Sequence, residues 1–244
     1  MKVEAIGIGL SRRTMFEAAD LGVRLVGANA RSVWRSFLPV HAFAVLVAAA
    51  VLPWGIGCSY LLLICIKPWL DRSLLFILAR AAFREETRFA DLVVVWKEVW
   101  FRDLLATLTI RRLSPWRSYV QPVQQLEGQR GAERRKRVKQ ILQNHRGAAL
   151  AMQSAFASVE SFITIGVAVL PMWFTTIDDR NDWVGIFYTG SGAWLPILQF
   201  LSYALAVGIV EPFFVGAGFA MYLNRRVELE AWDIEQEFRV AFAL

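Results

Sequence analysis

Two carboxylates inside long apolar stretches are the strongest candidates for chemistry in this sequence. Glu160 lies in the apolar run 148–177, and Glu211 lies near the middle of the run 193–223. A charge that faces lipid is costly, so each acid must face other helices, carry a proton or pair with a cation. One interpretation is a transporter or channel component in which Glu160 and Glu211 form a proton or ligand relay.

A structural interpretation of the same carboxylates remains open. Pro212 follows Glu211, and its ring removes one backbone hydrogen bond and bends the helix. The Glu211 carboxyl group can then hydrogen-bond carbonyls that the bend frees. Gly208, Gly216 and Gly218 would line the path in the first interpretation, whereas in this one they allow close packing of neighbouring helices.

The remaining reactive residue types do not combine into a catalytic or metal-binding pattern. Cys58 and Cys65 are seven residues apart on one apolar helix and so lie about 10 Å from each other along its axis, too far for a disulfide. His41 and His145 are isolated, so neither has the set of ligands that a metal needs. We therefore expect no catalytic residue, no metal and no cofactor, in a protein that is not an enzyme.

The composition indicates a membrane protein whose charges are segregated. Of 244 residues, 56% are hydrophobic and 20% are charged, which is too apolar for an ordinary soluble domain and too charged for a bundle buried entirely in lipid. Residues 67–146 contain 17 basic and 8 acidic residues, whereas 178–192 contain three acids and one arginine. Because basic residues beside spans stay in the cytoplasm, we expect a cytoplasmic centre and an exterior 178–192 segment.

The apolar stretches predict an all-α, polytopic helical membrane protein with about four membrane segments and a helical cytoplasmic layer. Residues 37–83 are expected to form a first membrane hairpin that turns at 53–57, with one long tilted span as the alternative. Within it, Lys67 and Asp71 should lie at an interface, pair with each other or face protein. Residues 148–223 are expected to form a second pair of transmembrane helices, which places both termini in the cytoplasm.

Residues 1–36 are expected to form an amphipathic N-terminal helix. Thr14 and Glu17 have the spacing of a capping box at its start. Apolar residues recur at steps of three and four, and they predict one apolar face: Phe16, Ala19, Val23, Val26, Ala30, Val33 and Phe37. This helix either lies in the plane of the anionic leaflet or packs on the cytoplasmic region of its own chain.

Residues 84–147 are expected to form a basic cytoplasmic helical region. Trp96 and Trp100 are predicted on its buried side or as interface anchors, and 114–131, with two prolines, is predicted to be a connection. A basic cluster follows, made of Arg134, Arg135, Lys136, Arg137 and Lys139. We expect this cluster to contact anionic lipid and to set topology, with a protein partner as an alternative. Nucleic acid is not expected, because no binding motif accompanies the cluster.

Residues 224–244 are expected to form an acidic amphipathic C-terminal helix that docks on the basic centre or on the basic surface of a partner. The residues predicted to take part in this docking are Arg225, Arg226, Glu228, Glu230, Trp232 and Asp233.

Three stretches, 66–83, 111–128 and 211–239, resemble an uncharacterised family of bacterial inner-membrane proteins. Members of that family tend to be encoded near MoxR-type ATPases, von Willebrand factor A domain proteins and transglutaminase-like membrane proteins. The resemblance implies a helical protein of the bacterial cytoplasmic membrane that works in a multi-protein envelope system. We therefore expect a non-enzymatic membrane subunit or scaffold whose partners are anionic lipids and either other membrane proteins or further copies of itself.

Overall fold

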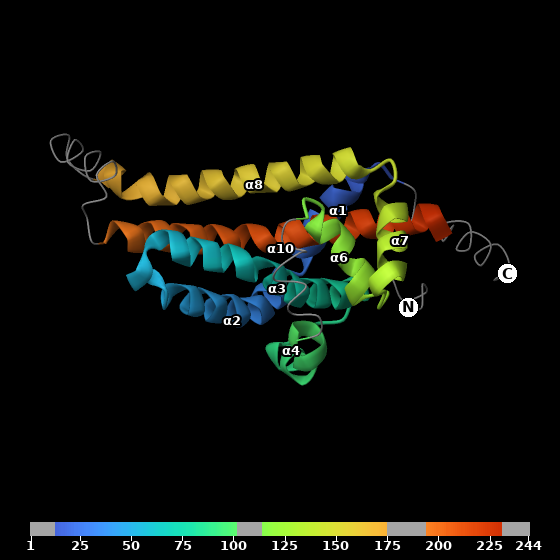
Figure 1. The fold of residues 1–244 in the computed structure, drawn as a ribbon, viewed down its shortest axis with the longest axis horizontal. Helices are drawn as coiled ribbons and strands as arrows, with labels where there is room; N and C mark the ends of the chain where they lie inside the picture. Colours follow the sequence, from blue (N-terminus) through green and yellow to red (C-terminus); the bar gives the residue numbers. More distant parts are fainter. Residues whose placement is uncertain (1–12, 102–113, 175–193, 231–244) are drawn as a thin grey trace.

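A computed structural model describes residues 13–101, 114–174 and 194–230 of the protein (Figure 1). These residues form helices and turns with no β-strand among them, which confirms the all-α fold class. The elements, in chain order, are α1 (Met15–Ala28), α2 (Ala30–Ala49), η2 (Leu52–Trp54), α3 (Ile56–Ala82), α4 (Phe89–Val94), η3 (Lys97–Phe101), α6 (Arg117–Gln125), α7 (Gly131–Leu142), α8 (Arg146–Val169), η5 (Leu170–Phe174) and α10 (Leu195–Glu230).

Three stretches are long and apolar enough to cross a membrane: Ala30–Trp54, Arg146–Val169 and Leu195–Glu230. They support the expected membrane character of the protein. The fourth long helix, α3, is not among these candidate membrane spans. It contains the charged residues Lys67, Asp71, Arg72 and Arg80. It nevertheless turns back from α2 and runs antiparallel to it (Figure 1).

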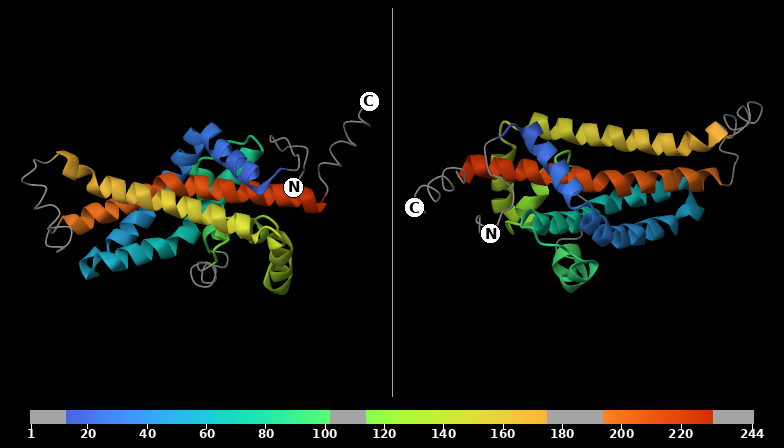
Figure 2. Two further views of the ribbon diagram at one scale, coloured as in Figure 1. Left: turned by 90° about the horizontal axis from the view of Figure 1, so that it is seen from above. Right: turned by 180° about the vertical axis from the view of Figure 1, so that it is seen from behind.

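Helix α10 is the central element of the fold. In its most apolar window 83% of the residues are buried, against 11% for α8. Helix α8 runs along one side of α10, α2 and α3 lie along another, and α1 crosses it obliquely (Figure 2). At the far end from the α2–α3 turn, α6 and α7 also contact α10. Helices α1, α3 and α8 therefore take their positions mainly from α10, whereas α2 packs mainly on α3.

The turn between α2 and α3 lies at the predicted place. Leu52–Trp54 form a single 3-10 turn. Gly55 follows it with a φ of 119°, a backbone conformation that glycine adopts readily because glycine has no Cβ atom. The first membrane helix begins earlier than the predicted boundary at residue 37, because α1 ends at Ala28 and α2 starts at Ala30.

The capping box at the start of α1 is present, since Glu17 N–H donates to Thr14 and Thr14 N–H donates to the Glu17 carboxylate. The predicted apolar face of α1 is only partly the face that packs on the protein, because Val26 is buried whereas the Phe16 side chain is 60% exposed. The buried residues of α1 are Met15, Ala18, Gly22 and Val26. This face is centred on Gly22, whose missing side chain lets the α10 backbone approach.

Two further sequence predictions need correction. The stretch 114–131 is not only a connection, since it contains α6, whose Tyr119 and Val123 are fully buried. Packing of this face against α10 stabilises a helix in spite of Pro122. The boundary at residue 224 is not a helix end, because α10 continues through the charged residues to Glu230.

Exposed tryptophans mark one end of the bundle. Trp54 is 75% exposed beside the α2–α3 turn, Trp173 is 78% exposed in η5, and Trp194 precedes α10. All three occur where the long helices end on the same side of the molecule (Figure 1). Tryptophan is enriched at membrane–water interfaces, so this end has the character of an interfacial aromatic belt. Exposed apolar side chains of α2, α8 and α10 follow this belt along the bundle.

Candidate functional site

Five ionisable side chains meet in the middle of the helix bundle and are called here the charge cluster: Lys67, Asp71, Arg117, Glu160 and Glu211. Lys67 stands between the two acids singled out from the sequence. Its Nζ atom lies 2.6 Å from Glu160 Oε2 and 2.9 Å from Glu211 Oε2. A single ammonium group therefore bridges α8 and α10.

Arg117 is the second cation of the charge cluster. Its Nε lies 2.6 Å from Asp71 Oδ2, and its Nη2 lies 2.5 Å from Glu211 Oε1. The guanidinium carbon also lies 5.2 Å from the centre of the Phe214 ring, one turn along α10, within the range of a cation–π contact. Arg117 is the first residue of α6, so it links that helix to both α3 and α10.

The local geometry of the helices explains how these groups converge. Lys67 and Asp71 are four residues apart on α3 and therefore project from the same face. Glu211 receives contacts from both cations, and its side chain is 1% exposed. The charge cluster thus ties α3, α6, α8 and α10 together at one level of the bundle.

The charge cluster contains three acids and two bases, so its formal charge is −1 when every group is ionised. One bound proton makes it neutral. On α2, the His41 ring lies beside the cluster and contacts the Ala204 carbonyl at 2.9 Å. Chemically, this arrangement can join helices and can hold one proton; it has no nucleophile paired with a base.

In the sequence Glu160 and Glu211 each appear without a partner. In the structure both are bound by Lys67. Sequence reasoning identified Glu160 and Glu211 but not their cations. Lys67 carried a usable signal, a charge within an apolar run, and it was expected to lie at an interface, to pair with Asp71 or to face protein. Of these alternatives the structure shows the last, since Lys67 faces the acids of α8 and α10. Arg117 carried no such signal, since it lies in a stretch predicted to be a connection.

The three glycines of α10 are each a point of close helix approach. A Cβ atom on Gly208 would lie 3.0 Å from the His41 ring of α2, and one on Gly218 would lie 2.3 Å from Ser118 of α6. Gly216 faces α1 in the same way. These positions favour the packing interpretation of the glycines over a path lined by them.

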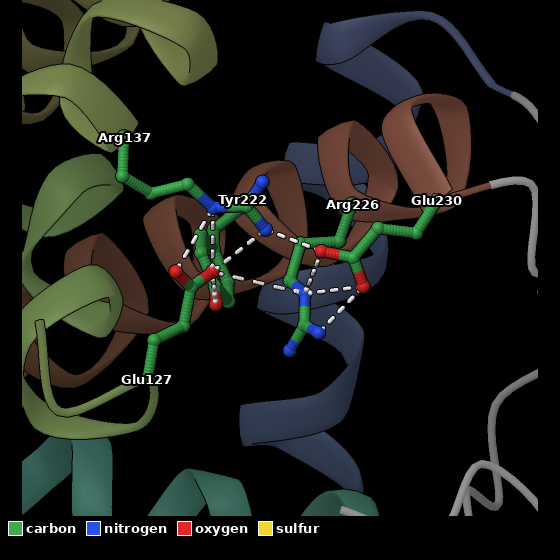
Figure 3. A network of polar contacts seen from close by, with 5 residues as sticks. All are labelled: Glu127, Arg137, Tyr222, Arg226 and Glu230. Carbon is green, nitrogen blue, oxygen red and sulfur yellow. Dashed lines mark hydrogen bonds and ion pairs between the residues drawn. The ribbon is translucent and has the colours of Figure 1, made fainter. Parts of the chain in front are cut away.

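A second polar group forms where α10 leaves the apolar part of the bundle (Figure 3). Glu127 accepts from Arg137 Nε at 2.9 Å and from the Tyr222 hydroxyl at 2.6 Å. Arg137 also pairs with Glu230, which is bound by Arg226 at 2.6 Å. The hydrogen bond with Glu127 raises the pKa of Arg137, despite the opposing effect of burial. The four charged side chains of this group, Glu127, Arg137, Arg226 and Glu230, border an open polar cavity of about 580 Å³.

The predicted basic cluster divides into residues with different surroundings. Arg137 is paired as described, Lys136 borders the polar cavity, and Arg134 lines a smaller cavity beside α6. Arg135 and Lys139 are exposed. The cluster is therefore only partly a solvated basic surface.

The end of α10 lies against α7 and the residues that follow it. Arg225 pairs with Glu228 at 2.7 Å and donates to the Gln140 carbonyl at 3.3 Å. Glu228 Oε2 lies 3.5 Å from His145 Nε2. Glu230 contacts Arg137, so acids of the predicted docking segment meet the basic centre of the same chain. Trp232, Asp233 and the segment 178–192 lie outside the described residues.

Within the described ranges, no group of three or more His, Cys, Asp and Glu side chains is arranged to hold a metal ion. Comparison of the sequence with protein-family models and with curated proteins, and of the fold with solved structures, found no match. The functional argument therefore depends on the site itself.

Proposed function

We propose that the protein is a non-enzymatic integral subunit or scaffold of a multi-protein complex in the bacterial cytoplasmic membrane. One observation carries the proposal: the two carboxylates that a relay would use are both bound by Lys67. Groups that are tied to fixed counter-charges hold helices in register. Truncating one partner of such a buried pair costs roughly 3–5 kcal/mol, so the charge cluster acts as a strong constraint on helix arrangement.

The outer face of α8 supports contact with another membrane helix. Small residues recur at steps of four, three and four along its exposed side: Gly147, Ala151, Ser154 and Ser158. Small residues let two helix backbones approach closely in lipid, where packing drives association. The Ser158 hydroxyl donates to the Ser154 carbonyl at 3.0 Å, so its polar atom is already satisfied beside an apolar partner. The partner is either another membrane protein or a second copy of this chain.

The proposed orientation places both termini and the basic α7 in the cytoplasm. Arg135 and Lys139 are exposed on the side of the bundle opposite the tryptophans, where anionic lipids attract basic residues. In a variant with both cysteines replaced by serine, single cysteines at Trp54 and at Lys139 should react with an impermeant maleimide from opposite sides of the membrane. Reaction of both from one side contradicts this orientation.

Purification in mild detergent, with cross-linking before extraction, tests the proposed function. We expect a stoichiometric membrane partner or a homo-oligomer. Ala151→Leu, on the small-residue face, should abolish the cross-link, whereas Val159→Leu at the edge of that face should preserve it. A wild-type protein that is monomeric and free of partners contradicts the proposal.

A transporter or channel component that uses Glu160 and Glu211 is the second candidate. The observation in its favour is that Arg117, which binds Glu211, also lines a cavity. In proteoliposomes, Glu211→Gln should then abolish ion flux while the protein remains folded. Equal flux with and without Glu211→Gln excludes this candidate.

A further inference from the structure

The charge cluster has one acid more than it has cations, and its contacts show which acid is the surplus one. Its cations are Lys67 and Arg117, and its acids are Asp71, Glu160 and Glu211. An uncompensated charge inside a helix bundle is expensive, and buried groups avoid this cost by changing their protonation state. One proton, bound to one of these acids at neutral pH, removes the excess charge.

Asp71 is the acid whose ionised form has the least support. Its side chain is fully buried, and both of its oxygens lack a hydrogen-bond donor among the described residues. The Nε atom of Arg117 lies 2.6 Å from Asp71 Oδ2, but the two groups are not aligned for a hydrogen bond. Burial without a donor favours the neutral form of a carboxyl group.

The other two acids are better compensated. Glu211 accepts a hydrogen bond from Arg117 Nη2, and its second oxygen is paired with Lys67. Glu160 accepts a hydrogen bond from Lys67 at 2.6 Å and is partly exposed. Hydrogen bonds from cations stabilise a carboxylate, so both acids are held in the ionised form.

Asp71 and Glu211 also lie too close together to be ionised at once. Nε and Nη2 share one edge of the planar Arg117 guanidinium, where Asp71 Oδ2 contacts the first and Glu211 Oε1 the second. The two carboxyl groups are therefore neighbours, within reach of a hydrogen bond to each other. Two carboxylates cannot make this bond, because both are acceptors. A proton on Asp71 makes it the donor and Glu211 the acceptor.

His41, beside the charge cluster, does not supply the missing positive charge. Its Nε2 atom contacts the Ala204 carbonyl at 2.9 Å and so carries the hydrogen of the neutral ring. Its Nδ1 atom is buried and has no hydrogen-bond partner within the described ranges. A second proton there would be a buried donor without an acceptor, which is unfavourable. The excess charge is therefore left to the carboxyl groups.

We propose that Asp71 binds one proton at neutral pH and donates it in a hydrogen bond to Glu211. The ligand of this site is thus a proton, held between α3 and α10. Glu211 then balances Arg117, and Glu160 balances Lys67, so the charge cluster is neutral. The inference does not depend on a membrane partner, and it assigns the proton to a residue other than the two acids of the transporter candidate.

Infrared spectroscopy of the full-length protein in maltoside detergent at neutral pH tests for the proton directly. A protonated carboxyl group gives a C=O band that is separate from the bands of carboxylates and amides. Labelling the side-chain carboxyl carbon of aspartate or of glutamate with a heavy isotope shows, without any substitution, which residue type carries the proton. Asp71→Asn assigns the band to a position. The matched control is Asp91→Asn, which removes a partly exposed aspartate paired with Arg80.

We expect a protonated-carboxyl band in the wild type that moves with the aspartate label, disappears in Asp71→Asn and persists in Asp91→Asn. The unfolding temperature is the second measurement. Asp71→Asn should stay within roughly 2 °C of the wild type, because the amide is neutral like the protonated acid and can still donate to Glu211. Glu211→Gln should lower the unfolding temperature by roughly 6 °C or more, since it removes the acid that both cations contact.

A wild-type protein without the band overturns the proposal, as does a band that does not move with the aspartate label. A large loss of stability or of folding in Asp71→Asn also contradicts it, because that result would show that Arg117 needs an ionised Asp71 as its counter-charge.

Discussion

Gly22 of α1 and Gly216 of α10 face each other where the two helices cross, with no space for a side chain on either. A Cβ atom on Gly22 would lie 2.1 Å from the Gly216 carbonyl oxygen. A Cβ atom on Gly216 would lie 2.6 Å from Val26 Cγ2 and 2.9 Å from the Gly22 carbonyl oxygen. The N-terminal helix is therefore held on the central helix by direct backbone approach.

Gly22→Ala should destabilise the protein by about 1–3 kcal/mol or more, because the methyl group forces the two backbones apart. Gly27→Ala is the matched control, since a Cβ there meets nothing within 4 Å and alanine is the better helix former. Thermal unfolding in detergent should show a lower Tm for the first variant and an unchanged or higher Tm for the second. A Gly22→Ala protein as stable as the wild type contradicts the crossing.

Lys67→Met should destabilise the protein by about 3–5 kcal/mol, because Glu160 and Glu211 lose the cation that they share. Adding Glu160→Gln to Lys67→Met should recover part of this loss, since it removes one uncompensated acid. The exposed Lys136 supplies the control, and Lys136→Met should have little effect on stability. Chemical unfolding of the wild type, of Lys67→Met and Glu160→Gln singly and of the double variant measures the coupling energy, and strictly additive effects count against the bridge.

Tyr119→Phe should change how stability depends on alkaline pH. Burial raises the pKa of the Tyr119 phenol above its ordinary value of 10.0, so the fold keeps it neutral. Its stabilising effect is complete below pH 10 and is lost as pH rises through the folded-state pKa. Below pH 10 the variant should be less stable by about 1 kcal/mol, since the hydrogen bond to the Ile141 carbonyl is lost. The Tm difference should shrink above pH 10; a constant difference refutes this assignment.

Asn224→Ala should release the start of α1 from α10. The Asn224 side chain accepts from the Arg13 backbone N–H at 3.1 Å and donates to the Arg13 carbonyl at 2.8 Å. Without these bonds, trypsin should cleave after Arg13 several times faster, because the backbone there opens more often. Gln143→Ala, which truncates an exposed amide, is the control. Equal cleavage rates for both variants would show that Asn224 does not hold this segment.

Local features of the fold could be predicted from the sequence, because they depend on residues only a few positions apart. The capping box of Thr14 and Glu17 and the turn at Gly55 depend on side chains and backbone angles within one or two turns. The ion pairs of Arg225 with Glu228 and of Arg226 with Glu230 follow from helical spacing in the same way. Apolar length alone was enough to indicate membrane helices.

By itself the sequence determined the helical class, the membrane character and the presence of two acids, Glu160 and Glu211, within apolar helices. Only the tertiary structure decided their partners: Arg117 and Glu211 are 94 positions apart and Lys67 and Glu160 are 93 apart. Hydrophobic periodicity marks which residues are buried but not which helix face they meet. That choice depended on backbone approach at Gly22, Gly216 and Gly218, where the absence of a side chain leaves no periodic signal.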